Sequence, residues 1–175
     1  MTDLANKVKT LIRDVPDFPK KGILFKDIMP ALRDATTLGR VFAALAAYGR
    51  KRGAEVVAGI ESRGFIFGAV VAAQLGVGFV PIRKAGKLPG KTVKQKYVLE
   101  YGKDAVEIQR DAVVKGERVL VVDDLLATGG TLAGSCRLIE KVGGVVAGCA
   151  CVVELSFLNG TRKLKGRDFY AIVRC

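Results

Sequence analysis

The segment from Val119 to Thr131, VLVVDDLLATGGT, gathers residues that can bind an anion and neighbouring hydroxyl groups. Its apolar start is typical of a buried parallel strand, and ligands of open α/β sheets bind at the carboxyl ends of such strands. The Thr-Gly-Gly-Thr stretch 128–131 leads into a predicted helix, whose N–H groups and dipole favour a phosphate. Asp123 and Asp124 offer acceptors to two adjacent hydroxyls and could orient water around a divalent ion. A phosphate site next to acceptors for sugar hydroxyl groups fits a ribose 5-phosphate.

A purely structural explanation of this segment stays open. The two acids would then cap the strand, the glycines would form an ordinary turn, and Thr131 would be only a helix N-cap. A single Gly-Gly pair would favour that explanation. The combination of an apolar strand, two adjacent acids and the Thr-Gly-Gly-Thr loop favours binding.

A second segment, Ser62-Arg63-Gly64, ends one predicted buried strand and begins the next helix. Arg63 and the nearby backbone donors can therefore hold a diphosphate. A helix N-cap by Ser62 is compatible with this role.

Positive charge concentrates in a third segment. The chain has a net charge of +12, and seven cations lie between Arg83 and Lys103 against one acid, Glu100. Residues 83–96 have no clear period, so we expect a long, mobile, cationic loop there, with Gly86 and Gly90 as hinges. A solvated lysine face is the alternative, but a loop between strands better suits an electrostatic funnel for an anionic ligand.

The pattern along the chain predicts an α/β fold in one domain, with a central, mostly parallel sheet flanked by helices. An amphipathic helix over 4–15, a short strand at 23–25 and a helix with an apolar stripe at 38–45 come first. The strands that follow are predicted at 56–60, 77–82, 118–122 and 145–153, and the helices at 65–75 and 132–142.

Composition argues against several classes of site and location. The chain has no histidine and four cysteines without C-x-x-C spacing, so a zinc site is not expected. The first residues lack the apolar core of a signal peptide, which predicts a cytoplasmic protein. The most apolar stretch, 68–82, is shorter than the roughly 20 residues of a membrane span, so no membrane association is expected.

The segment 119–131 resembles the 5-phosphoribosyl-1-diphosphate (PRPP) signature of type I phosphoribosyltransferases. Nearly the whole chain is similar to the adenine phosphoribosyltransferase family within that group. The further segments that carry this resemblance are Phe18–Ile28, Glu61–Gly68, Arg83–Gly90 and Leu99–Gly102.

The resemblance implies the type I phosphoribosyltransferase fold in one domain, 1–175, with a small N-terminal hood over about 1–33 and a core over about 34–175. It implies the conversion of adenine and PRPP into AMP and diphosphate, in a homodimer. Mg²⁺ would be held mainly by PRPP, with water bridging it to Asp123 and Asp124. A non-proline cis peptide is implied near Glu61–Ser62.

The resemblance also implies roles for individual residues. Glu100, Arg63 and Lys87 would be catalytic, with Glu100 near the imidazole edge of the purine. Lys26 stands where the family often has arginine, which leaves backbone contacts to adenine unaffected but puts a side-chain role in doubt. The binding residues would be Asp123, Asp124, Ala127, Thr128, Gly129, Gly130 and Thr131 for phosphate and ribose, Ser62, Arg63, Arg83 and Lys87 for diphosphate, and Leu24, Phe25 and Lys26 for adenine.

Two other functions stay open from the sequence. The PRPP signature does not select the acceptor, so a transferase for another base such as xanthine is the nearest alternative. A regulatory module that binds PRPP and nucleic acid is the second, because of the net charge. No appended helix-turn-helix supports the second alternative, and the cations concentrate beside the proposed site, so no nucleic-acid partner is expected.

Overall fold

The computed structural model describes residues 3–99 and 102–175. It describes the side chains of these residues except those of 98, 99 and 102–104. Its elements in chain order are α1 (Asp3–Leu11), β1 (Arg13–Pro16), β2 (Leu24–Asp27), α2 (Met29–Arg33), α3 (Ala35–Lys51), β3 (Val56–Ile60), α4 (Arg63–Leu75), β4 (Gly78–Lys84), β5 (Thr92–Leu99), β6 (Gly102–Gln109), β7 (Arg118–Val122), β8 (Leu125–Leu126), α5 (Gly130–Lys141), β9 (Val145–Glu154), the 3₁₀ turns η1 (Ser156–Leu158) and η2 (Gly160–Leu164), and β10 (Phe169–Arg174).

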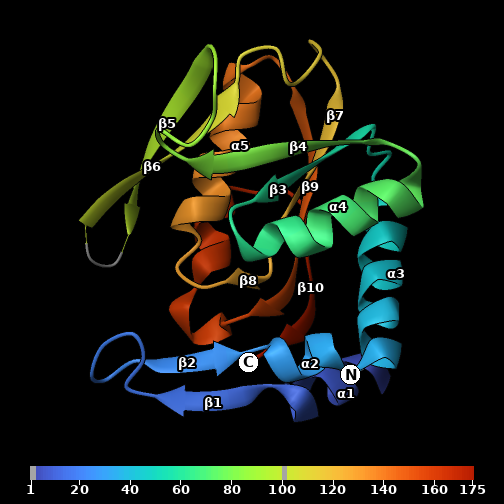
Figure 1. Cartoon of the computed structure of the whole chain (residues 1–175), viewed down its shortest axis with the longest axis vertical. Coiled ribbons are helices and arrows are strands. Elements are labelled where there is room, and N and C mark those ends of the chain that lie inside the picture. Colours follow the sequence, from blue (N-terminus) through green and yellow to red (C-terminus); the bar gives the residue numbers. More distant parts are fainter. Residues whose placement is uncertain (1–2, 100–101) are drawn as a thin grey trace.

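The main sheet has the order β10-β9-β7-β3-β4-β6-β5, with β8 paired to β9. The strands from β10 to β4 are parallel, and β6 and β5 continue the sheet antiparallel. This arrangement confirms the expected α/β fold with a mostly parallel sheet. The separate two-stranded sheet β1-β2 lies beyond the carboxyl ends of the parallel strands, near β8 (Figure 1).

Two apolar cores lie on opposite faces of the sheet. In β7, Val119 and Val121 face the core that α5 covers, whereas Leu120 and Val122 face the core formed with α1, α3 and α4. The same helices lie on opposite sides of the strands in Figure 1. A strand buried on both faces needs a continuous apolar run, which is why β3 and β7 have the predicted bounds.

Two predictions about local structure are wrong. The first helix ends at Leu11 instead of reaching residue 15, because Val15 belongs to β1 and pairs with Phe25. The expected long loop at 83–96 is short, because β4 continues to Lys84 and β5 begins at Thr92. Within the described ranges, no helix is long and apolar enough to cross a membrane.

Candidate active site

The loop after β7 forms a small hollow at the first turn of α5. Gly129 is the N-cap of this helix and has a φ of 76°, a left-handed conformation that favours glycine. Thr128, Gly129, Gly130 and Thr131 line the hollow, which has a volume of about 130 Å³. Helix N–H groups without intrahelical partners point into such a site, so it suits a phosphate.

This loop packs closely against the start of η2. A Cβ atom on Gly129 would overlap the carbonyl group of Gly160, and one on Gly160 would overlap the carbonyl oxygen of Ala127. The loop can therefore keep its shape only with glycine at both positions. The sequence predicts no role for Gly160, because no local pattern indicates this approach of two distant segments.

The two acids follow β7 directly and differ in exposure. Asp124 is 4% exposed, while Asp123 keeps part of its surface open to the cleft. Asp123 Oδ1 accepts a 2.9 Å hydrogen bond from the Asp124 backbone N–H. Dense surroundings, and then the neighbouring Asp124 carboxylate, raise the pKa of Asp123 well above its usual value. Burial likewise raises the pKa of Asp124, against the opposing effect of the Arg63 guanidinium.

A polar cleft with a volume of about 510 Å³ extends from these acids to the turn between β3 and α4. Ser62 and Arg63 line this cleft, and Arg63 Nε lies 2.8 Å from Asp124 Oδ2. The Glu61–Ser62 peptide bond is cis, as the resemblance implies. The cleft thus combines a guanidinium, backbone donors and two carboxylates, a set that can hold a charged sugar phosphate.

An apolar hollow with a volume of about 550 Å³ lies between the β1-β2 hairpin and the segment after β9. Phe25 lines it, and Phe18 meets the Phe25 ring edge-on with 5.1 Å between ring centroids. The Arg63 guanidinium carbon lies 5.3 Å from the Phe25 centroid. Leu155 and Phe157 line the far side. An aromatic ring beside a guanidinium suits a flat heterocycle.

The three hollows adjoin one another. Leu125 lines all three of them, and Arg63 lines both the polar cleft and the apolar hollow. A ligand with a flat base, a sugar and a phosphate would therefore find each binding surface around a single residue.

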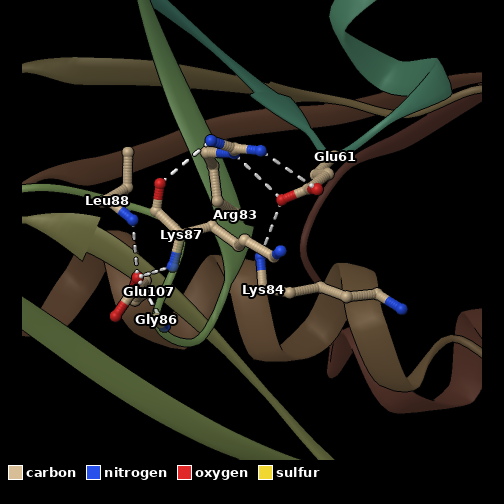
Figure 2. Close-up of polar contacts among 7 residues, drawn as sticks. All are labelled: Glu61, Arg83, Lys84, Gly86, Lys87, Leu88 and Glu107. Carbon is tan, nitrogen blue, oxygen red and sulfur yellow. Dashed lines mark hydrogen bonds and ion pairs between the residues drawn. The ribbon is translucent and has the colours of Figure 1, made fainter.

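The loop between β4 and β5 is held at the edge of the polar cleft by ion pairs and backbone contacts (Figure 2). Arg83 donates to both Glu61 carboxylate oxygens, over 3.0 Å from Nε and 3.2 Å from Nη2. Arg83 Nη1 donates to the Lys87 carbonyl over 2.9 Å. The Arg83 hydrogen bond is the main cause that lowers the pKa of Glu61. Glu61 therefore stays ionised and fixes Arg83.

Comparisons with known proteins identify the family. The Phosphoribosyl transferase domain family matches residues 32–173. Adenine phosphoribosyltransferase of Caldanaerobacter subterraneus subsp. tengcongensis is 52% identical over 167 residues, which cover 95% of this chain and 96% of that protein. The chain belongs to the adenine phosphoribosyltransferase family.

Solved structures of this family have the same fold. The adenine phosphoribosyltransferase of Thermoanaerobacter pseudethanolicus has a TM-score of 0.94 and 49% identity, covering 98% of this chain and 99% of that one. The Saccharomyces cerevisiae structure has a TM-score of 0.92 and 38% identity, covering 98% of this chain and 99% of that one. The yeast protein is complexed with adenine and an imino-altritol bisphosphate.

Most residues that the family resemblance singled out lie around these hollows. The residues expected to bind phosphate and ribose line the loop hollow or the polar cleft. Leu24, Phe25 and Lys26, expected for adenine, line the apolar hollow, but Lys26 Nζ is already paired with Asp14 Oδ1 at 2.7 Å. Arg83 and Lys87, expected for diphosphate, belong to β4 and the β4-β5 loop and line none of the three hollows, and Arg83 contacts Glu61 instead. Glu100 lies outside the described residues.

Three residues that line the hollows of this adenine phosphoribosyltransferase family member have no role predicted from the sequence. Leu125 lies within the segment 119–131 but has no predicted role, although it is the residue that the three hollows share. Leu155 and Phe157 follow the predicted strand 145–153, at the carboxyl edge of the sheet where ligands bind. Their position after this predicted strand is the feature of the sequence that indicates a place near a ligand.

Proposed function

We propose that this chain transfers the phosphoribosyl group of PRPP to adenine, giving AMP and diphosphate in purine salvage. The observation that carries the proposal is the meeting of the three hollows at Leu125. The loop hollow takes the 5-phosphate, the acids take the ribose hydroxyls, and the polar cleft takes the diphosphate. The apolar hollow takes the base, because the Phe25 ring beside the Arg63 guanidinium suits a flat heterocycle. The solved yeast relative is complexed with adenine.

The chemistry needs charge stabilisation more than covalent help. As the bond between the ribose carbon and diphosphate breaks, positive charge develops on the sugar and negative charge on the leaving group. Arg63 and Lys87 stabilise the diphosphate, while the loop at 128–131 holds the 5-phosphate in place. Glu100 remains our proposed acid–base group near the purine, because the chain has no histidine.

Magnesium is part of this proposal. The adjacent carboxylates of Asp123 and Asp124 fit an ion held mainly by substrate oxygens, with water between the ion and the protein. They do not form a closed protein site, since the described residues contain no cluster of three or more metal-ligating side chains. When bound, Mg²⁺ would neutralise part of the charge on the departing diphosphate.

Selection of adenine is assigned to the N-terminal part of the chain. We propose that residues 1–33 form a hood over the base and that 34–175 form the core. Backbone groups of Leu24 and Lys26 would accept from the exocyclic amine and donate to N1, a pattern that a 6-oxopurine reverses. Phe25 would pack against the ring. We also propose that the chain is cytoplasmic and forms a homodimer. Sedimentation of the purified chain would test the homodimer.

The test is the formation of AMP and diphosphate from adenine, PRPP and Mg²⁺, measured for the wild type and Asp124→Asn. We expect equal amounts of both products, loss of turnover with a chelator, and its recovery when Mg²⁺ is restored. Asp124→Asn should be impaired, because the neutral amide can no longer form an ion pair with Arg63. PRPP binding without turnover by the wild type would contradict the enzyme and favour a regulatory module.

A further inference from the structure

Glu107 is a buried acid that the proposed mechanism does not use. It lies in β6 between Val106 and Ile108, and its side chain is 1% exposed. Glutamate is almost never fully buried unless its carboxylate is paired or hydrogen-bonded. The partners of this carboxylate therefore indicate what it does.

Three consecutive backbone N–H groups of the β4-β5 loop donate to one oxygen of Glu107. Gly86, Lys87 and Leu88 lie 2.8, 2.9 and 3.0 Å from Oε1. The other oxygen, Oε2, accepts from Thr92 Oγ1 over 3.2 Å and lies 3.7 Å from Lys94 Nζ. Burial alone would raise the pKa of Glu107, but the three amides and the Thr92 hydroxyl together lower it. The carboxylate is therefore ionised at neutral pH.

The loop thus binds an anion supplied by its own chain. Successive N–H groups that converge on one point form a nest, which is a common anion-binding arrangement. Here Glu107 occupies the nest, with Gly86 at a φ of 87° giving the turn its shape. Hydrogen bonds to an ionised acceptor are about twice as strong as neutral ones, so the charge itself matters for the anchor.

Lys87 is fixed from both sides of its backbone. Its N–H donates to Glu107, and its carbonyl accepts from Arg83, which Glu61 holds in turn. In Figure 2 the Lys87 side chain runs back past Arg83 towards Glu61, and no hydrogen bond drawn there involves its ammonium group. The charge of Lys87 contributes to lowering the pKa of Glu61, in line with this direction.

We propose that Glu107 is a positioning residue, which holds the Lys87 backbone so that the ammonium group reaches the departing diphosphate in the transition state. This inference rests on the proposed function of Lys87. It assigns Glu107 an effect through the loop and no contact with substrate. A glutamate that merely stabilises the fold is the competing explanation.

The two explanations predict different results in a double-mutant cycle. Glu107→Gln keeps the size of the side chain but removes its charge, and should lower kcat roughly 10- to 100-fold with a smaller change in the KM for adenine. In a Lys87→Met background, the same substitution should have little further effect on kcat, because the group that it positions is gone. Additive losses in the two backgrounds, or an unchanged kcat in Glu107→Gln, would overturn the inference.

Two further variants complete the design. Glu117→Gln is the matched control, since Glu117 also accepts from a backbone N–H, that of Val114 at 2.9 Å, but on a loop away from the three hollows, and its kinetic constants should not change. Thr92→Val removes only the donor to Oε2 and should give a smaller loss of kcat with the same dependence on Lys87. It keeps the cycle measurable if Glu107→Gln proves too unstable.

The activity of the wild type distinguishes a failure of the proposed function from a failure of the positioning role of Glu107. A wild type that makes no AMP from PRPP and adenine would contradict the proposed function itself. A wild type that makes AMP, together with variants that show no dependence on Lys87, would contradict only the positioning role of Glu107.

Discussion

Arg63 and Asp124 form an ion pair across the site, with 2.8 Å between Arg63 Nε and Asp124 Oδ2. Arg63 is the first residue of α4, and Asp124 follows β7, so the pair joins the two loops at the carboxyl edge of neighbouring parallel strands. The same guanidinium lies beside the Phe25 ring. Arg63 is therefore in contact with both the acid that we assign to ribose and the ring that we assign to adenine.

This relationship predicts the effect of changing Arg63. Arg63→Gln should lower kcat/KM for PRPP by about 100-fold or more, since it removes a charged donor to the leaving group and leaves Asp124 without its partner. Arg63→Lys should recover only part of this loss, because a lysine cannot keep the planar guanidinium at both contacts. Steady-state kinetics at saturating adenine measure both variants, and full activity of Arg63→Gln would exclude the assigned role.

The close contact between Gly129 and Gly160 predicts that Gly129→Ala disrupts the phosphate loop. Gly166 provides a matched control, because both glycines have a φ of 76° but Gly166 has no atom within 4 Å of an added Cβ. Gly166→Ala should cost only about 1 kcal/mol of unfolding free energy and keep its KM for PRPP. Gly129→Ala should, in addition to a cost in unfolding free energy, raise the KM for PRPP at least about tenfold. Equal behaviour of the two variants would show that the overlap does not matter.

Phe25 and Lys26 both line the apolar hollow, but their substitutions should have very different effects on the KM for adenine. Phe25→Ala should raise the KM for adenine roughly tenfold or more, because it removes the ring that packs beside the base. Lys26→Met should leave the KM and the choice of base unchanged, since the Lys26 ammonium is paired with Asp14. Kinetics with adenine as the varied substrate test both variants, and a changed choice of base in Lys26→Met would contradict the backbone mechanism of selection.

Tyr48 provides a prediction about stability alone. Its hydroxyl is buried with no hydrogen-bond partner among the described residues, so Tyr48→Phe should increase the free energy of unfolding by up to about 1 kcal/mol. Burial raises the pKa of Tyr48 to about 12, above the ordinary value of 10.0. The folded state then holds its proton where the unfolded state has lost it, so wild-type stability should fall as the pH rises from about 10 towards 12.

Denaturant unfolding of the wild type and Tyr48→Phe at neutral and alkaline pH measures both effects. The alkaline loss should be smaller in the variant, which lacks this titrating group. A less stable variant with an unchanged pH dependence would mean that the hydroxyl has a bonding partner in solution.

The sequence predicted the centre of the sheet well because that region obeys a simple rule. Strands such as β3 and β7 must be apolar on both faces, so their continuous runs mark their bounds. The polar loops that follow them provide most of the proposed site, and the position of Asp123, Asp124 and the 128–131 loop after β7 was correctly predicted.

The β5 strand shows where such prediction failed. Its cations obscured a period of two, in which Lys94 and Lys96 are exposed while Tyr97 is buried. Glu107 offers a signal in the sequence, because an acid between Val106 and Ile108 requires partners when the strand is buried. The contact between Gly129 and Gly160 had no signal, since it depends on how two distant backbones meet.

The most direct test of the central claim is a competition between purine bases. The enzyme would receive adenine, hypoxanthine, guanine and xanthine in equal amounts with limiting PRPP and Mg²⁺, and the nucleotide products would be separated by chromatography. The account predicts that AMP forms and that the other three nucleotides stay at background levels. Formation of IMP, GMP or XMP at a rate comparable with AMP would contradict it.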